Sequence, residues 1–295
     1  MVLQDYIAMN EIYARLFDFL EIGDSFPTVI MGVLNLSPES FYKGSVYNDL
    51  TLLEKATLEM VDGGAKILDL GARSTAPWSK KITIKEELDR LTPSMELVCK
   101  IIPNEIVISI DTQYREAAQQ TYDIAIKHKK RIIINDVSCL KTDPTIIDFI
   151  VEHDLPIILM ASKNVPGDLC TVDEIIEEFK STIKILKKKG YDLKKVILDP
   201  GIGHWIERKT HKYDLKIIGN LNKLRVLGKP ILVAISRKSF IGTTLDIPDP
   251  ENRLNGTLAA TAVAVYNGAH IVRTHDINNQ LMEFTKMAEE IRKNK

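Results

Sequence analysis

The feature that most constrains the fold of this chain is a recurrence of short apolar runs rich in β-branched residues. Eight such runs occur, TVIMGVLN from residue 28, KILDLG from 66, IVISID from 106, RIIIND from 131, PIILMAS from 156, KVILDPG from 195, PILVAISRK from 230 and AHIVRTHD from 269. Most of them are continuously apolar and do not alternate with polar residues. Such runs are typical of parallel strands that are covered on both faces. The sequence therefore predicts a buried parallel sheet.

Segments with helical spacing separate these runs. In one of them Thr171 and Glu174 form a capping box, and Gly190 is expected to end the helix. In another, a stripe of apolar residues begins at Leu50 and stops before Gly63. Strand and helix alternate through all eight runs, which predicts an α/β fold, the (β/α)8 or TIM barrel, in a single domain. A doubly wound open sheet is the alternative layout.

The first 27 residues precede the first predicted strand. Charged residues interrupt the apolar ones in this segment, and it has neither the basic start nor the small-residue cleavage site of a signal peptide. We therefore predict an N-terminal extension, residues 1–27, that forms an amphipathic helix ahead of a barrel domain spanning residues 28–295. Its role is either to close the N-terminal end of the barrel or to extend a dimer contact.

Composition and charge exclude several classes of partner. Lys and Arg number 39 and Asp and Glu number 40, so the chain has no field to attract a polyanion such as nucleic acid. No window approaches the roughly 18 apolar residues needed to span a membrane. The three cysteines are scattered, with no spacing typical of a disulfide framework or a zinc site. We expect a cytoplasmic protein that acts on small molecules.

Polar residues gather at the C-terminal ends of seven of the eight predicted strands. In a barrel these ends face one shared mouth, where catalytic loops lie. These residues are Asn35, Asp69, Asp111, Thr112, Asn135, Asp136, Asp199, Ser236, Lys238, Arg273, His275 and Asp276. A single Asp or Asn there is most often a turn residue or a helix cap, which is an open alternative for Asp136 and Asp276. Asp69, with apolar neighbours on both sides, is the strongest case for a structural role, bonding either to the backbone or to a partner within the barrel. Their convergence nevertheless indicates a site.

Two adjacent strand ends carry an expected anion site. Lys238, Arg273 and His275 would bring two cations and one titratable imidazole to the rim of the barrel, with Ser236 as a hydroxyl donor. The low dielectric of such a rim strengthens their attraction for an anion. The arrangement predicts a phosphate-type ligand. Arg237, which lies between these residues, is interpreted as a surface ion pair with a nearby carboxylate.

The opposite side of the mouth carries hydrogen-bond acceptors. Asp111 and Asp199 are carboxylates, and Asn135 offers an amide that both donates and accepts. A carboxylate accepts two parallel N–H bonds, so this set suits a flat heterocycle with an amidine-like edge. A metal is the alternative use of these carboxylates. No spacing in the chain matches a metal motif built from protein ligands alone.

With these residues placed, the chain resembles the dihydropteroate synthase family from about residue 28 to residue 290. The resemblance rests on several motifs that occur in the family's order and at similar intervals. They are MGVLNLSPESF, GARSTAPWS, SIDT, INDVS, ILDPGIG, SRKSFIG and RTHD. The family is a (β/α)8 barrel that joins 6-hydroxymethyl-7,8-dihydropterin diphosphate to an aryl amine, normally para-aminobenzoate. Pyrophosphate is released with the help of Mg²⁺, and the family's members are typically homodimers.

The resemblance implies a role for each matching residue. Asp111, Asn135, Asp199 and Lys238 would hold the pterin, Asn35 would be the Mg²⁺ ligand, Arg273 and His275 would anchor the diphosphate, and Thr75 and Ser236 would line the aryl-amine pocket. Catalysis is assigned to Lys238, Arg273 and His275, which would stabilise the departing diphosphate before the amine attacks. Glu39, where the family usually has Asp, would screen the resulting cation.

The match departs from the family on the aryl-amine side. In the second loop Arg73 and Ala76 flank Ser74-Thr75, where the family usually has Glu before and Arg after this pair. The run HWIERKTHKYD replaces a short Phe-Gly-Lys run, and LMASKNVPGD lacks the usual His-Met pair. Neutral change in loops is one interpretation. The other is a bulkier or charged amine contacted by Arg73, His204 and Arg208. A pterin-dependent methyltransferase and a noncatalytic pterin-binding protein are the alternative functions.

Overall fold

The eight predicted strands form a closed parallel barrel in the computed structural model, which describes residues 11–38, 46–47, 49–74, 79–203 and 206–294. The strands are β3 (Val29–Asn35), β4 (Ile67–Gly71), β5 (Val107–Asp111), β6 (Ile132–Asp136), β7 (Ile157–Met160), β8 (Val196–Asp199), β9 (Leu232–Ala234) and β10 (Ile271–Thr274). They pair in the order β8-β7-β6-β5-β4-β3-β10-β9. A parallel bridge between Leu198 and Ile231 closes the ring. The barrel prediction is confirmed, and the open-sheet alternative is wrong.

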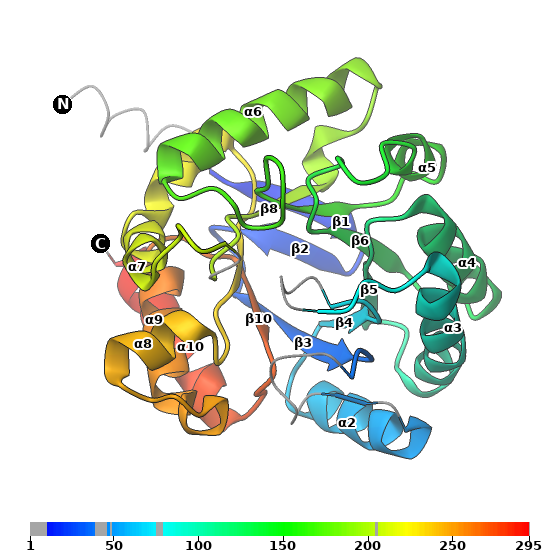
Figure 1. The fold of residues 1–295 in the computed structure, drawn as a ribbon, viewed down its shortest axis with the longest axis horizontal. Coiled ribbons are helices and arrows are strands. Elements are labelled where there is room, and N and C mark those ends of the chain that lie inside the picture. Colours follow the sequence, from blue (N-terminus) through cyan, green and yellow to red (C-terminus); the bar gives the residue numbers. More distant parts are fainter. Residues whose placement is uncertain (1–10, 39–45, 48, 75–78, 204–205, 295) are drawn as a thin grey trace.

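Helices cover the outer face of the barrel (Figure 1). They are α2 (Leu50–Asp62), α3 (Ile84–Ile101), α4 (Arg115–Lys127), α5 (Ile146–Glu152), α6 (Val172–Lys188), α7 (His211–Gly219), α8 (Ser239–Leu245), α9 (Leu254–Tyr266) and α10 (Asn279–Lys293). The capping box of α6 forms as predicted, and Gly190 beyond its end has a left-handed φ of +76°. No helix in the described part of the chain is long and apolar enough to cross a membrane.

The interior of the barrel changes character from one end to the other. Near the N-terminal ends of the strands it is apolar, with Met31, Ile67, Val107, Ile133, Ile158, Ile197, Leu232 and Ile271 in one cluster. Two residues further along β4, β5, β6 and β10 the inward positions hold Asp69, Ser109, Asn135 and Arg273. Because side chains alternate along a strand, this step of two keeps the same face. Polarity therefore rises toward the C-terminal mouth.

The N-terminal extension contains an antiparallel hairpin, β1 (Tyr13–Phe17) and β2 (Leu20–Gly23). The prediction of a helix is therefore wrong for residues 13–23, while residues 1–10 lie outside the described part. The physical reason is a period of two, since Ala14 and Leu16 are buried and Arg15 between them is exposed. The buried face packs on the apolar cluster. Of the two expected roles, the hairpin has the first, since it closes the N-terminal end of the barrel.

Asp24, just after the hairpin, ties it to the barrel wall. Its carboxylate accepts the backbone N–H of Ile12 at 2.8 Å and both terminal nitrogens of Arg225, at 2.7 and 2.8 Å. The Nε2 of the buried His270 lies 3.3 Å from the same carboxylate. Although burial alone would raise the pKa of Asp24, the bonds from His270 and Arg225 hold it well below its ordinary value. The hairpin is thus fixed by charge as well as by apolar contact.

Candidate active site

A polar network lies at the C-terminal mouth and joins four of the strands. Arg273 of β10 donates from Nε to Asp69 of β4 at 2.6 Å and from Nη2 to Asp111 of β5 at 3.3 Å. Asn135 of β6 donates from Nδ2 to Asp69 at 3.2 Å. Asp69 is therefore the partner within the barrel that its apolar surroundings suggested. Its charge orients Arg273 and Asn135, which the sequence placed in the site.

A glycine makes room for Asp111. Gly71 of β4 is paired with Asp111 across the sheet. A Cβ added at Gly71 would lie 3.2 Å from the Cβ of Asp111 and 3.3 Å from its Oδ2. Contacts this close would force the carboxyl group to move. The absence of a side chain at residue 71 thus sets the position of the Asp111 carboxyl group.

Two carboxyl groups of the mouth have perturbed acidity. Burial, followed by the charge of Asp69, raises the pKa of Asp111 to about 8. Burial also raises the pKa of Asp199, whose Oδ1 accepts the backbone N–H of Gly201 at 2.8 Å. A buried carboxylate is costly unless N–H donors face it. Both groups would be stabilised by a ligand that brings such donors, which is the property expected of the heterocycle site.

Two lysines hold the turn that follows Asp199. Lys238, at the start of α8, donates from Nζ to the carbonyl of Ile202, and burial lowers its pKa to about 8. Lys209 donates to the carbonyl of Gly201 at 2.6 Å and lies 3.5 Å from Asp214. Sequence reasoning missed Lys209 because it belongs to a run of charged residues that looks like a solvent loop. The local sequence gives no signal of its burial, which depends on carbonyls from loops elsewhere in the chain.

His275 and Ser236 lie together at the rim, as the sequence predicted. His275 Nδ1 is 3.0 Å from Ser236 Oγ, and the backbone N–H of His275 donates to the same oxygen at 3.3 Å. Burial, together with the charges of Arg273, Arg237 and Lys238, lowers the pKa of His275 to about 3. The imidazole is therefore neutral at physiological pH and offers a hydrogen bond rather than a charge.

Arg237 forms the ion pair that was expected of it, but not on the surface. Its Nε and Nη2 donate to the two oxygens of Asp276 at 2.8 and 2.7 Å, and the arginine is buried. Its Nη1 also donates to the carbonyls of Pro250 and Glu251, at 2.9 and 2.6 Å. The surface location was wrong because these carbonyls, from a loop thirteen residues further on, enclose the guanidinium.

Asn35, the residue expected to bind the metal ion, lies in the described part of the chain. It ends β3, is half-buried, and its Oδ1 accepts the N–H of Ser37 at 3.2 Å. Within the described ranges no cluster of three or more His, Cys, Asp or Glu side chains is arranged to hold a metal ion. An amide oxygen is a hard ligand of the kind that Mg²⁺ accepts, and Mg²⁺ commonly keeps several waters and binds substrate phosphates beside few protein ligands. Glu39, Thr75 and Ala76 lie outside the described residues.

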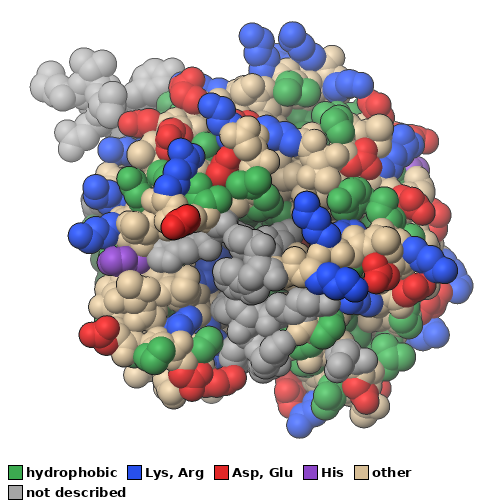
Figure 2. All heavy atoms as spheres, in the orientation of Figure 1, with side chains coloured by type: hydrophobic (Ala, Val, Ile, Leu, Met, Phe, Trp, Pro, Cys, Tyr) green, Lys and Arg blue, Asp and Glu red, His purple; other side chains and the backbone are tan. Residues whose placement is uncertain are grey.

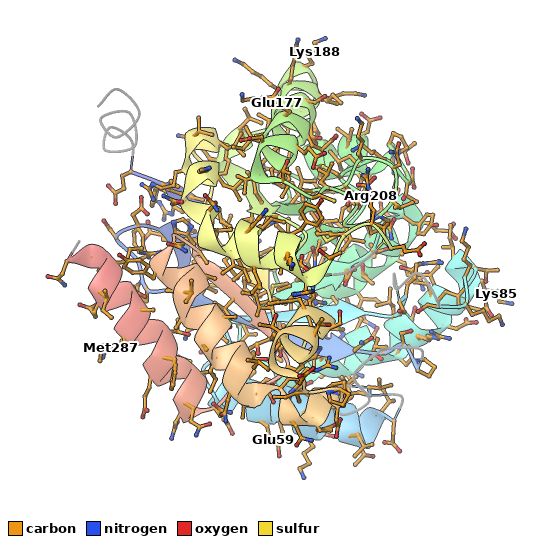
Figure 3. All side chains as sticks on the ribbon, turned by 60° about the vertical axis from the view of Figure 1, so that its left-hand side comes forward. Glu59, Lys85, Glu177, Lys188, Arg208 and Met287 are labelled. Atoms are coloured by element: carbon orange, nitrogen blue, oxygen red, sulfur yellow. The ribbon has the colours of Figure 1, made fainter. Side chains whose placement is uncertain are left out.

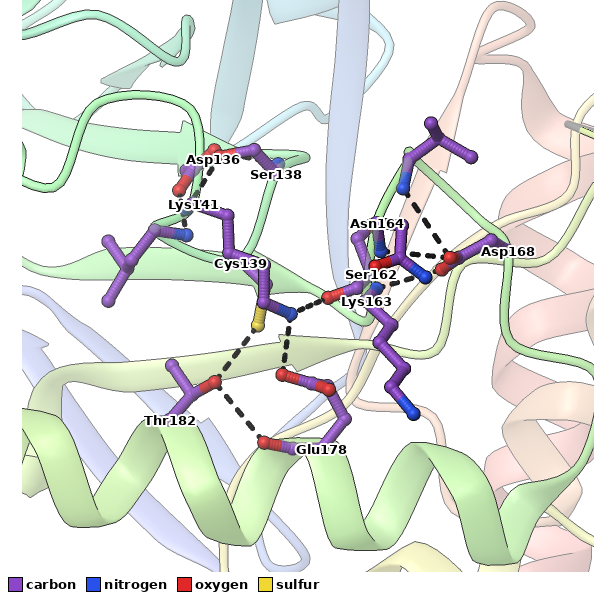
Figure 4. Close-up of polar contacts among 12 residues, drawn as sticks. Asp136, Ser138, Cys139, Lys141, Ser162, Lys163, Asn164, Asp168, Glu178 and Thr182 are labelled. Atoms are coloured by element: carbon purple, nitrogen blue, oxygen red, sulfur yellow. Dashed lines mark hydrogen bonds and ion pairs between the residues drawn. The ribbon is translucent and has the colours of Figure 1, made fainter.

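The loops after β6 and β7 form a compact hydrogen-bonded unit (Figure 4). Asp136 accepts the backbone N–H groups of Ser138 at 2.7 Å and Leu140 at 2.5 Å, so its role is that of a turn acceptor. Asp168 likewise accepts the N–H groups of Lys163 and Asn164, at 2.8 and 2.9 Å. These bonds give the loop that lacks the family's His-Met pair a defined conformation.

The two described arginines on the aryl-amine side are held by intramolecular bonds. Arg208 donates from Nη2 to the carbonyl of Asp168 at 2.9 Å. Arg73 donates from Nε and Nη2 to Glu87 at 2.9 and 2.7 Å, and from Nη1 to the carbonyl of Ile82 at 2.5 Å. His204, the third residue considered for a charged amine, lies outside the described residues. Because both guanidinium groups have partners within the protein, neither contact favours a bulkier or charged amine.

The fold and this site define a pterin-binding barrel, and comparison with known proteins agrees. The model of the "Pterin binding enzyme" family matches residues 31–275, so the chain belongs to that family. The dihydropteroate synthase of Bacillus subtilis is 36% identical over 260 residues, which are 88% of this chain and 87% of that protein. The dihydropteroate synthase of Escherichia coli is 32% identical over 84% of this chain and 86% of that protein.

Solved structures give the same result. A dihydropteroate synthase from Coxiella burnetii in complex with pteroic acid superposes with a TM-score of 0.81 at 32% identity, over 96% of this chain and 99% of that one. The Xanthomonas albilineans dihydropteroate synthase with 4-aminobenzoic acid gives 0.78 at 26% identity, over 97% and 98%. Within the family the chain is therefore a dihydropteroate synthase, a transferase. The synthase interpretation is confirmed in preference to the methyltransferase and noncatalytic alternatives.

Proposed function

We propose that this protein joins 6-hydroxymethyl-7,8-dihydropterin diphosphate to para-aminobenzoate. The C–O bond between the pterin methylene and the diphosphate breaks, and its electron pair leaves on the diphosphate. A C–N bond then forms between the methylene carbon and the amine nitrogen, which loses a proton. The observation that carries this proposal is the set of Asp111, Asn135 and Asp199 beside Arg273 and Lys238 at one barrel mouth.

The pterin is held, in this proposal, by the acceptors of the mouth. Asp199 takes two N–H groups of the pyrimidine edge, while Asp111 and Asn135 bond to the remaining ring nitrogens. The raised pKa values of Asp111 and Asp199 support this. Burial disfavours the ionised form of each carboxyl group, and N–H donors from the ligand would stabilise that form. Lys238, whose pKa is about 8, donates to an acceptor of the ring from the opposite side.

The diphosphate leaves toward Arg273, His275 and Ser236. Arg273 is aimed by its bond to Asp69, so it needs little reorganisation when charge develops on the leaving group. The neutral His275 donates a hydrogen bond, and Ser236 aligns its ring. Asn35 would hold Mg²⁺, which would supply positive charge to offset that of the diphosphate. Glu39, in this proposal, screens the cationic methylene, and Thr75 lines the aryl-amine pocket with Ser236.

The amine is para-aminobenzoate rather than a larger aryl amine. Arg73 and Arg208, two of the three residues that would contact a charged extension, already donate to Glu87 and to the carbonyl of Asp168. Turning Arg73 toward such an extension would require breaking its bonds to Glu87. A direct competition between para-aminobenzoate and an aryl amine bearing a ribosyl phosphate tests the assignment. Preference for the larger amine contradicts it.

Product formation tests the activity itself. Pyrophosphate release is measured from the pterin diphosphate with Mg²⁺, with and without para-aminobenzoate, while the product mass is followed. We expect release that depends on the benzoate, and the mass of dihydropteroate. A protein that binds the pterin diphosphate yet forms no condensed product under these conditions would overturn the proposed reaction.

We also place the homodimer contact, which is part of the proposal, on helices α9 and α10. Their outer faces form a mostly apolar groove lined by Val263, Tyr266, Phe284, Met287 and Ile291, together with two alanines and Glu283. Met287 is 64% exposed and points away from the body of the molecule (Figure 3). Contiguous apolar surface of this kind marks interaction sites, whereas charges of both signs are interspersed over the face shown in Figure 2.

Sedimentation of a charged variant tests the dimer contact. Met287→Glu is expected to convert the dimer to a monomer, because it places a carboxylate in an apolar contact. The control is Ile185→Glu on α6, where an apolar side chain is also exposed but lies outside the groove. Monomeric wild-type protein at micromolar concentration, or a dimeric Met287→Glu protein, would contradict the contact.

A cytoplasmic location, also proposed, is consistent with Cys99, Cys139 and Cys170, which form no disulfide.

A further inference from the structure

A ring of contacts beside the end of β5, made of hydrogen bonds and one cation–π contact, joins Arg73, Glu87, Thr112 and Tyr114. Glu87, in the first turns of α3, is fully buried at 0% exposure. Its Oε2 accepts both Nε and Nη2 of Arg73 in the loop after β4, and its Oε1 accepts the hydroxyl of Thr112 at 2.7 Å. Thr112 follows Asp111 directly. One carboxylate therefore joins two of the loops that shape the mouth.

The ring is completed through Tyr114. Its backbone N–H donates to the Thr112 hydroxyl at 3.3 Å, and its aromatic ring lies 4.8 Å from the guanidinium carbon of Arg73. Arg73 also donates to the carbonyl of Ile82, just ahead of α3. Each member is thus linked to two others, and the ring spans α3 and the segments that follow β4 and β5. Buried networks in which every member is satisfied fix a single arrangement.

We propose that Glu87 is a positioning residue for the pterin site, which sets the Asp111 end of β5 through Thr112 and holds Arg73 at the start of the second loop. The inference rests on the proposed function, because it assigns Asp111 to the pterin. It also explains the rearranged second loop. Arg73 replaces the family's usual Glu and turns inward to Glu87, so it serves the geometry of the pterin side instead of contacting the amine.

Thr112→Val tests the inference with nearly unchanged volume. The variant keeps the shape of the side chain but loses the hydroxyl that Glu87 accepts. We expect pteroic acid to bind about tenfold more weakly by titration calorimetry, because small misplacements of a binding group weaken catalysis and recognition steeply. Thr112→Ser retains the hydroxyl and is expected to restore binding to within about twofold. A merely structural role would lower the melting temperature and leave the dissociation constant of the folded protein unchanged.

The matched control is Thr121→Val. Thr121 is equally buried, but its hydroxyl donates to the Ala117 carbonyl of its own helix at 2.8 Å and has no link to Glu87. This variant is expected to lose stability without a change in pteroic acid affinity. If Thr112→Val binds pteroic acid as tightly as Thr121→Val does, the inference is wrong.

A double-mutant comparison isolates Glu87 itself. Glu87→Gln is expected to weaken pteroic acid binding at least as much as Thr112→Val, and adding Thr112→Val to it should cost little more, because both changes break the same link. Additive losses would overturn the inference. The calorimetric measurement needs no turnover, so it stands apart from the activity assay. A wild-type protein that binds pteroic acid but makes no product would defeat the proposed reaction and leave this test intact.

Discussion

The two ends of the barrel are built from opposite chemistry. At the N-terminal end a hairpin covers an apolar layer, and Asp24 is fully engaged with Arg225 and His270. At the C-terminal mouth Asp111 and Lys238 are largely buried. Burial raises the pKa of Asp111 and lowers that of Lys238, so both shifts favour the neutral form. Contacts at the first end stabilise the folded state, whereas the second end holds groups whose charged forms the folded state disfavours. The comparison predicts that substitutions separate into those that affect stability and those that affect activity.

The largest loss of activity without a loss of stability is expected from Asp199→Asn at the mouth. The amide replaces one acceptor oxygen by a donor, which opposes the N–H groups of the pterin, so about 3–4 kcal/mol of binding is lost. This corresponds to a fall in kcat/KM of roughly 10²–10³-fold. The melting temperature should not fall, because the raised pKa of Asp199 shows that its ionised form is disfavoured in the fold. A lower melting temperature with intact kinetics would break the comparison.

The converse is expected from Ile22→Ala in the hairpin. Ile22 is fully buried against the apolar layer, so its truncation should lower the free energy of unfolding by about 2–5 kcal/mol. Urea denaturation measures this loss, and kcat/KM of the protein that remains folded should stay within about twofold. Phe19→Ala, in the exposed turn of the same hairpin, serves as the control and should cost under about 0.5 kcal/mol.

Gly71→Ala tests whether the mouth depends on exact spacing. The new methyl group would press on Asp111, so we expect roughly a tenfold rise in the KM for the pterin substrate. Gly219→Ala is the matched control, since nothing lies within 4 Å of its added Cβ. Steady-state kinetics distinguishes them. Equal KM values for the two variants would show that Asp111 tolerates displacement.

Asp24→Asn should expose the electrostatic part of the closed end. A lowered pKa means that the carboxylate stabilises the fold above its ordinary pKa and that this contribution is lost as the pH falls below it. The variant should therefore be about 1 kcal/mol less stable at pH 7, since the pair is partly exposed, and the difference should narrow toward pH 3. A constant difference across this range would mean that packing alone fixes the hairpin.

The smallest effect expected is a shift in the pH profile from Lys238. Its pKa of about 8 means that the ammonium form is lost as the pH rises through that value, so kcat/KM should fall on the basic side. Lys238→Arg keeps its charge over this range and should move the fall to higher pH, whatever its effect on the maximum. A profile unchanged by this substitution would assign the basic limb to another group.

The barrel was predictable because its signals are local. Most of the buried strands are continuous apolar runs that end in or just before a polar residue, and the resemblance to the synthases indicated which of these residues to expect at the pterin. The hairpin was not predictable in the same way, because Glu11, Arg15 and Glu21 interrupt its apolar residues and an amphipathic helix gives a similar pattern. Burial of alternate residues became clear only against the barrel floor.

The orientation of two cations was also beyond the sequence. Arg73 turns inward because Glu87, in the next helix, is buried beneath it, and no local pattern reports such a partner. Lys209 is buried because the loops after β7 and β8 approach each other and present carbonyls to it. Both residues lie in charged or rearranged loops, where long-range contacts decide which side chains face solvent.

The closure of the barrel between β8 and β9 has a consequence for motion. Within the described residues a single bridge, from Leu198 to Ile231, joins these two strands, and the Leu198 N–H donates to the Pro230 carbonyl at 3.0 Å. Other neighbouring strands share longer ladders of paired residues. Asp199 and Lys238 lie on the two sides of this seam. A pterin bound by both residues would hold the two strands together at this seam. Amide hydrogen exchange at Leu198 should therefore slow on binding pteroic acid, and by more than the exchange at Ile108, which lies within a continuous ladder.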